Sequence, residues 1–140
     1  MKYNELMAGD WITDEYTRPM QVYHVDMGRA YADSGCTLYE FNKDYPPQPI
    51  EITPELLKVN GWDEYSGTLF HNFKKYIRMS DEKGNHLEWR NGELFIWFDY
   101  EKEHDRVYNI IFPCKYVHQL QQVLRFAGMT ELANNFNILI

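Results

Sequence analysis

The chain has 140 residues, of which 44% are hydrophobic and 25% charged, and its formal net charge at pH 7 is −7. This length suits one domain, or two small lobes, and leaves enough chain for a hydrophobic core. The acidic balance argues against nonspecific binding to nucleic-acid phosphates, which relies on lysine and arginine, although a local basic patch stays compatible with it. The sequence has no apolar run long enough to span a bilayer and no secretory signal, so we expect a cytoplasmic protein without a membrane partner.

The first 45 residues predict a small β lobe. Aromatic residues make up 16% of the chain, and aromatic side chains favour strands. Short β-prone segments are separated by turn residues, among them Gly28 and Ser34-Gly35. The first predicted strand begins at Gly9. Three more strands are predicted at 20–27, 30–33 and 36–41. Several short strands joined by tight turns are typical of a curled sheet or a partial SH3-like barrel.

The middle of the chain predicts a linker, a short helix and a second antiparallel sheet. Three prolines within 42–49 exclude a central strand there. Thr53-Pro54-Glu55 is a typical helix start, which predicts a helix near 54–60. Asn91-Gly92 favours a tight hairpin turn, because both positions of a type I′ turn need positive φ. Further strands are predicted at 68–73, 76–80, 87–90, 93–100, 107–112 and 136–140.

Residues 116–127 give the clearest helical pattern, with apolar residues at helical spacing and Gly128 placed to end the helix. We therefore predict an α+β protein with mainly antiparallel sheet. The lobe 1–45 is followed by a unit 46–140, in which the 116–127 helix covers the sheet, and the two join in one compact structure. The 93–112 strands are too apolar for a sheet with one face in water, so either the N-terminal lobe or a second copy of the chain in a homodimer should cover the other face.

The polar residues of this helix are the most distinctive candidate site. Two interpretations stay open: a recognition face for a protein or nucleic acid, or a solvated helix face, which we favour. The candidate interaction face consists of His118, Gln119, Gln121, Gln122 and Arg125.

Two further clusters carry weaker chemical hypotheses. Asp99, Glu101, Glu103, His104 and Asp105 contain oxygen ligands suited to a hard cation, but a charged hairpin tip explains them equally well. Cys114 lies beside Lys115, which would favour a reactive thiolate, but a buried structural cysteine is the better interpretation. We therefore predict no catalytic residue, no metal site and no cofactor. Cys36 and Cys114 match no metal or redox motif, so both are expected to be free thiols.

Three patches of the sequence resemble a family of small proteins from Bacteroides-type gut bacteria, their phages and their mobile elements, a family with no established activity. The patches are Asn4-Glu5-Leu6 with Gly9-Asp10-Trp11-Ile12, Ile52 to Leu57 with Gly61-Trp62, and Tyr116 to Gln121 with the following residues up to Phe136. The Val-His-Gln-Leu-Gln block is the most specific part. The resemblance implies a cytoplasmic protein of a bacterium or an infected cell and carries over no catalytic residue or ligand.

Three hypotheses for function follow. The leading hypothesis is a non-enzymatic accessory protein of a phage or mobile element that binds another protein. An acidic surface near Asp10, Asp14, Glu15, Asp26 and Asp33 would suit a basic partner. The alternatives are a nucleic-acid-binding module that uses the small barrel and the polar helix face, and a hydrolase built around Cys114 or His104.

Overall fold

The structure, a computed structural model, describes residues 5–34, 38–66, 75–80, 85–99 and 106–138. It confirms an α+β fold with two antiparallel sheets, of four and five strands, and three short helices in the described part of the chain. The chain forms two compact units, one from residues 1–51 and 116–140 and the other from 52–115. This division differs from the predicted boundary at 45/46, because the C-terminal helices group with the N-terminal sheet.

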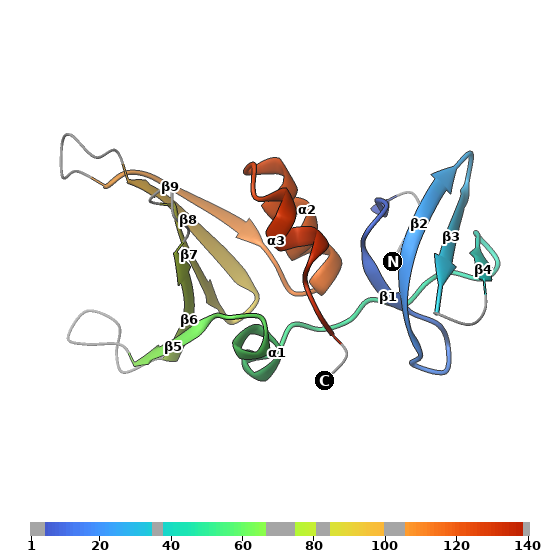
Figure 1. Ribbon diagram of the computed structural model, residues 1–140, viewed down its shortest axis with the longest axis horizontal. Helices are drawn as coiled ribbons and strands as arrows, with labels where there is room; N and C mark the ends of the chain where they lie inside the picture. The colour runs from blue at the N-terminus through green and yellow to red at the C-terminus, as the bar shows by residue number, and fades with distance from the viewer. Residues whose placement is uncertain (1–4, 35–37, 67–74, 81–84, 100–105, 139–140) are drawn as a thin grey trace. The chain divides into compact units, whose positions relative to one another are not determined.

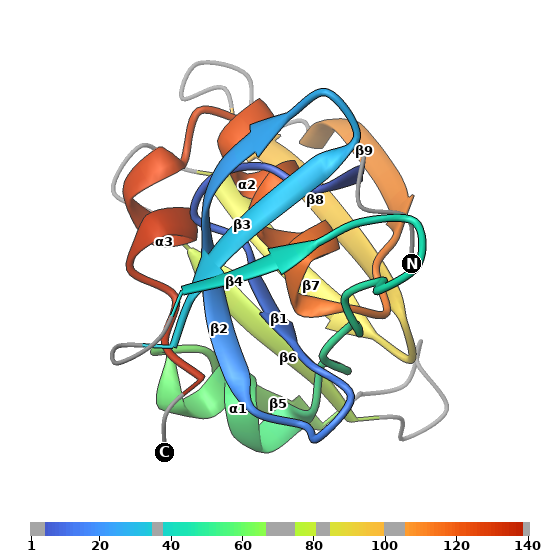
Figure 2. The same cartoon turned by 90° about the vertical axis from the view of Figure 1, so that its right-hand side faces the viewer.

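The first unit contains the four-stranded sheet, in which the strands are neighbours in chain order (Figure 1). The strands are β1 (Trp11–Thr13), β2 (Pro19–Asp26), β3 (Arg29–Asp33) and β4 (Leu38–Phe41). After β4 the chain returns to β1, where Thr13 and Gln48 form a bridge with N–O distances of 2.9 and 2.8 Å. Strand β1 therefore has a partner on both sides, and the sheet curls as predicted (Figure 2).

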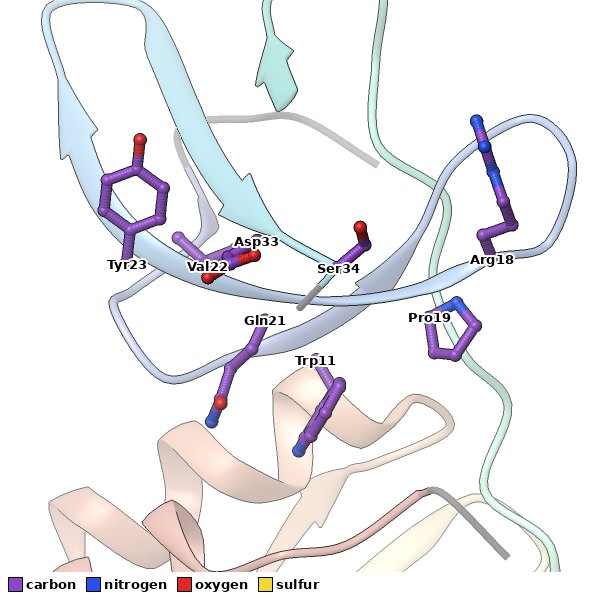
Figure 3. A pocket seen from close by; sticks show the side chains of 8 residues that line it. All are labelled: Trp11, Arg18, Pro19, Gln21, Val22, Tyr23, Asp33 and Ser34. Atoms are coloured by element: carbon purple, nitrogen blue, oxygen red, sulfur yellow. The ribbon is translucent and has the colours of Figure 1, made fainter. Parts of the chain in front are cut away.

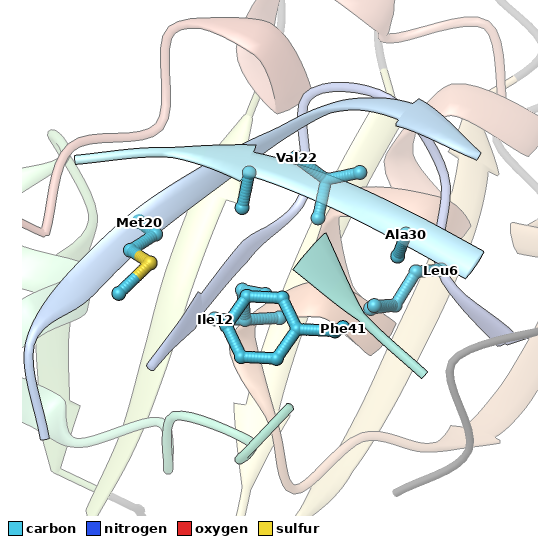
Figure 4. Close-up of a cluster of buried hydrophobic side chains, with 7 residues drawn as sticks. Leu6, Ile12, Met20, Val22, Ala30 and Phe41 are labelled. Carbon is cyan, nitrogen blue, oxygen red and sulfur yellow. The ribbon is translucent and has the colours of Figure 1, made fainter. Parts of the chain in front are cut away.

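One face of this sheet forms the hydrophobic core of the first unit (Figure 4). Inward positions alternate along the strands, as in Met20 and Val22 on β2 and Ala30 and Ala32 on β3, because successive side chains of a strand point to opposite faces. Leu6, Ile12 and Phe41 complete the core cluster. The two alanines leave room on the inner face for the larger side chains.

Two helices complete the first unit, α2 (Val117–Phe126) and α3 (Thr130–Asn134). Helix α2 packs against β1 and α3, and Val117, Leu120 and Leu124 are buried along its apolar side. Gly128 ends the helix in the left-handed conformation, with φ +84°, as the sequence predicted. A final strand predicted at 136–140 does not form over 136–138, where Phe136 is buried in irregular structure; the last two residues lie outside the described part.

The second unit is an antiparallel meander of five strands preceded by helix α1 (Pro54–Val59). The strands are β5 (Asp63–Ser66), β6 (Lys75–Ser80), β7 (Asn85–Arg90), β8 (Glu93–Asp99) and β9 (Arg106–Pro113). Asn91 and Gly92 join β7 to β8 with φ of +46° and +85°, which confirms the predicted hairpin turn. The predicted strand 68–73 lies outside the described residues.

Helix α1 begins where its sequence predicted. The Leu56 N–H donates to Thr53 Oγ1 at 3.2 Å, and Pro54 occupies the first turn, where it has no hydrogen bond to lose. Leu56 and Leu57 are buried, and α1 contacts β5 and β6. Across the described parts of both units, no helix combines the length and the apolar character needed to cross a membrane.

Candidate functional site

The polar face of α2 binds the N-terminal segment of its own unit. Gln121 is fully buried, and its Nε2 donates to the Gly9 carbonyl at 2.8 Å and to the Ala133 carbonyl at 3.0 Å. Its Oε1 accepts the Trp11 backbone N–H at 2.9 Å. One glutamine side chain thus joins β1, α2 and α3 through hydrogen bonds to three backbone groups.

Arg125 and Gln122 bind the same segment through the buried carboxylate of Asp10. Arg125 Nη1 lies 2.6 Å from Asp10 Oδ1, and Gln122 Nε2 lies 2.8 Å from Asp10 Oδ2. The Met7 N–H donates to the same Oδ2 at 2.8 Å, and Gln122 also donates to the Glu5 carbonyl at 2.5 Å. Arg125 Nη1 and Gln122 Nε2 therefore have acceptors within the unit, whereas the buried Arg125 Nη2 has no hydrogen-bond partner among the described residues.

The two remaining residues of the candidate face also have local roles. Gln119 Oε1 accepts the Tyr116 N–H at 3.1 Å at the start of α2. His118 is buried, and its ring stacks on Tyr116 with 6.0 Å between centroids. Burial lowers the pKa of His118, and the nearby carboxylates of Asp10 and Glu5 only partly oppose this shift.

The prediction that these five side chains form a solvated face was therefore wrong for His118 and Gln121, which are buried. Nothing in the sequence indicated that Gly9, 112 residues before Gln121, supplies an acceptor for its side chain. The Gly9-Asp10-Trp11 patch stands out in the sequence, but the sequence does not show that its partner lies on α2. For the same reason Asp10 does not belong to an acidic surface, since its carboxylate is buried against Arg125.

A groove of about 540 Å³ lies on the first unit, and we call it the tyrosine groove. It gathers residues from the β1–β2 loop, from β4 and from the segment that returns to β1. Its lining consists of Asp14, Glu15, Tyr16, Arg18, Tyr39, Glu40, Phe41, Asp44, Tyr45, Pro46 and Gln48.

The floor of the groove is organised by Asp14, whose carboxylate is buried. Its Oδ1 accepts the N–H groups of Tyr16 and Arg18, each at 2.9 Å, and its Oδ2 accepts Arg18 Nε at 2.6 Å. Burial by itself would raise the pKa of Asp14, but these hydrogen bonds and the guanidinium charge outweigh it and lower the pKa. The carboxylate thus fixes the loop that carries Tyr16.

Two tyrosine rings flank the guanidinium of Arg18. Its Cζ lies 5.4 Å from the centroid of the Tyr16 ring and 5.2 Å from that of Tyr39. Both distances are within the range of cation–π attraction. A positive, planar group therefore occupies this part of the groove between two aromatic faces and a carboxylate.

The rest of the groove is acidic and aromatic. Tyr16 and Tyr45 are 70% and 64% exposed, which is high for such large side chains. Glu40 pairs with Arg29 at 3.2 Å, whereas the carboxylates of Glu15 and Asp44 have no ion-pair partner within the described residues. Exposed tyrosines beside unpaired carboxylates are suited to a partner that is polar and positively charged.

A second hollow of about 490 Å³ lies beside the first on the same unit (Figure 3). In Figure 3 the side chains of Trp11 and Gln21 lie on one side of β2, and those of Tyr23 and Arg18 on the other. The Trp11 indole donates to the Phe136 carbonyl at 2.7 Å and so has a structural role. Because the polar groups do not converge, this hollow is the weaker candidate.

The other candidate residues offer no active site in the described part of the chain. Cys114 is a free, fully buried thiol, and burial raises its pKa to about 12, which disfavours the thiolate that a nucleophile needs. Glu101, Glu103, His104 and Asp105 lie outside the described residues, as do Cys36 and the side chain of Asp99. Among the residues that are described, no three His, Cys, Asp or Glu side chains gather as metal ligands would.

No protein-family model, curated protein or solved structure matches this chain.

Proposed function

We propose that this protein is a non-enzymatic interaction protein that binds a segment of another protein in the tyrosine groove. The observation that carries the proposal is the pair of highly exposed tyrosines, Tyr16 and Tyr45, beside carboxylates on a hydrogen-bonded β scaffold. Tyrosine supplies large contact area with few rotatable bonds, and it is enriched among the residues that dominate binding energy. The rigid loop around Asp14 keeps Tyr16 in place before a partner arrives.

Two features make the alternative functions weaker. A nucleic-acid module would need the polar face of α2, but Gln121, Gln122 and Arg125 donate to acceptors within their own unit. The groove itself carries carboxylates that repel phosphates. A hydrolase built on Cys114 would need a reactive thiolate, which burial disfavours.

The biological setting is part of the proposal. The resemblance of the Gly-Asp-Trp and Val-His-Gln-Leu-Gln patches to small proteins of Bacteroides-type bacteria and their phages supports an accessory role in a phage or mobile element. The partner would then be a host or phage protein in the cytoplasm. A homodimer stays a prediction, which light scattering over a range of concentrations would test.

The test is capture of partners by the tagged, full-length protein from a Bacteroides-type host, with and without nuclease. The decisive comparison uses Tyr16→Ala/Tyr45→Ala, which removes two exposed rings without disturbing the core. The matched control is Tyr23→Ala, since Tyr23 is 49% exposed on the same sheet and does not line the groove.

The proposal expects a polypeptide partner that resists nuclease, is retained by wild type and by Tyr23→Ala, and is lost by the double variant. Two results would overturn it. One is capture that is equally strong with the double variant. The other is recovery of nucleic acid alone, with retention that falls steeply as salt rises.

A further inference from the structure

We infer that the tyrosine groove recognises an arginine side chain of its partner, and that Arg18 occupies the same place in the free protein as an internal competitor. This inference rests on the proposed function and specifies the chemistry of the partner. It follows from the surroundings of Arg18, which already form a complete site for a guanidinium group.

The first observation is geometric. Arg18 makes a charged hydrogen bond to the buried carboxylate of Asp14, at 2.6 Å, and its guanidinium lies against Tyr16 and Tyr39 at cation–π distances of 5.4 and 5.2 Å. Aromatic faces attract cations, and a carboxylate accepts hydrogen bonds from a guanidinium, so the combination suits an arginine side chain. The groove therefore already binds a guanidinium, the one supplied by its own loop.

The second observation concerns how weakly Arg18 is enclosed. Its side chain is 52% exposed, while the carboxylate it binds is buried, so the guanidinium can leave without exposing the core. Asp14 keeps the two backbone hydrogen bonds from Tyr16 and Arg18 when the side chain leaves. The exchange of one guanidinium for another therefore preserves the turn.

The third observation is charge. Besides Asp14, the carboxylates of Glu15, Glu40 and Asp44 line the same groove, and Arg18 is its only basic lining residue among those described. A partner arginine that displaces Arg18 gains the same contacts. The partner residues on either side of that arginine then lie near the remaining carboxylates of the groove. A guanidinium matches better than an ammonium because it is planar and can lie against the rings while donating to the carboxylate.

The experiment uses the full-length, isotope-labelled protein and a short blocked peptide with a single arginine among glycines and serines. Its matched probe replaces arginine by citrulline, which has a nearly identical shape but no charge. Binding is followed by the backbone signals of Asp14, Tyr16 and Tyr39 and by the Arg18 side-chain N–H signal. In wild type the arginine peptide should shift these signals, including that of Arg18, and the citrulline peptide should not.

Removing the internal competitor should strengthen binding. We expect Arg18→Ala to bind the arginine peptide roughly two- to fivefold more tightly than wild type, in line with the strength of an exposed cation–π contact. Lys58→Ala is the matched control, because it also removes one positive charge but lies in α1 of the second unit, paired with Glu64. It should bind like wild type, which separates displacement from the change in net charge.

Arg18→Gln, which keeps the length of the side chain, serves if Arg18→Ala folds poorly. The inference is overturned if neither variant binds more tightly than wild type, if the citrulline peptide binds equally well, or if the wild-type Arg18 side-chain signal does not respond. Each of these results leaves the proposed function standing, provided that the double tyrosine variant loses its partner. Conversely, if the groove binds the arginine peptide tightly but no protein is captured, the proposed function is wrong and the arginine site in the groove stands.

Discussion

Asp10 and Arg125, which are 115 residues apart in sequence, form a buried ion pair with 2.6 Å between Oδ1 and Nη1. The pair joins the start of β1 to α2 within the first unit. Gln122 and the Met7 N–H satisfy the second carboxylate oxygen. The stability of this unit therefore depends on a polar contact as well as on its apolar core.

We expect Asp10→Ala to lower the free energy of unfolding by about 3–5 kcal/mol, because it leaves a buried guanidinium without its counterion. Urea unfolding of the full-length protein measures the loss. Replacing Arg29, which pairs with Glu40 on the surface, is the control and should change stability little. Equal effects at the two sites would mean that burial of the Asp10–Arg125 pair has no energetic importance.

Gly9→Ala and Gly128→Ala form a matched pair of substitutions. Both glycines have positive φ, +94° and +84°, so each alanine carries a conformational cost of about 1–2 kcal/mol. At Gly9 the added Cβ would also lie 2.7 Å from Arg125 Nη2, whereas at Gly128 it meets nothing within 4 Å. Thermal unfolding should show the larger loss for Gly9→Ala. If the two variants lose equal stability, the contact between the added Cβ and Arg125 does not lower the free energy of unfolding.

Stability should fall as the pH drops below the ordinary histidine range because of His118. Burial lowers the pKa of His118 in the folded protein below the ordinary histidine value of 6.5, so the unfolded chain takes up a proton first. Protonation therefore favours unfolding as the pH falls from the unfolded pKa towards the lower folded one. Urea midpoints measured between about pH 7 and pH 5 should decline more steeply for wild type than for His118→Gln.

His24→Gln is the control for this experiment, because it makes the same substitution at an exposed histidine. Parallel slopes for wild type and His118→Gln would contradict the assignment of His118 as a buried neutral histidine.

Cys114 should not react with thiol reagents while the protein is folded. Its sulfur is inaccessible, and burial raises its pKa to about 12, so almost no thiolate exists at neutral pH. A Cys36→Ser background isolates the signal, and one thiol should then react only after denaturant is added. Rapid labelling of the folded variant would show that the strand end around Cys114 opens readily. In the unfolded wild type without reductant, a count of two thiols would confirm that both cysteines are free.

Local patterns in the sequence predicted the local features of the fold. The Asn91-Gly92 turn, the Thr53 cap of α1 and the Gly128 end of α2 each depend on a few adjacent residues and on backbone geometry. They could be predicted because the same residues form such features in any chain.

Features made by distant segments could not be predicted in this way. Periodicity identified the apolar stripe of α2, but it could not show that Gly9 and Asp10 would cover its polar side. The tyrosine groove was missed for the same reason. Tyr16, Tyr39 and Tyr45 lie in separate segments, and only the curled sheet brings them to one site.

The first unit is assembled from both ends of the chain, with the second unit inserted between residues 51 and 116. On the ribosome, the N-terminal sheet therefore emerges long before α2. The Asp10 carboxylate and the Gly9 carbonyl lack these donors until Arg125 and Gln121 have been synthesised. The second unit has all of its strands in one continuous stretch and can fold as it leaves the exit tunnel. Translation that stops before α2 is made would leave the N-terminal sheet without its polar partners, a form that chaperones and proteases would recognise.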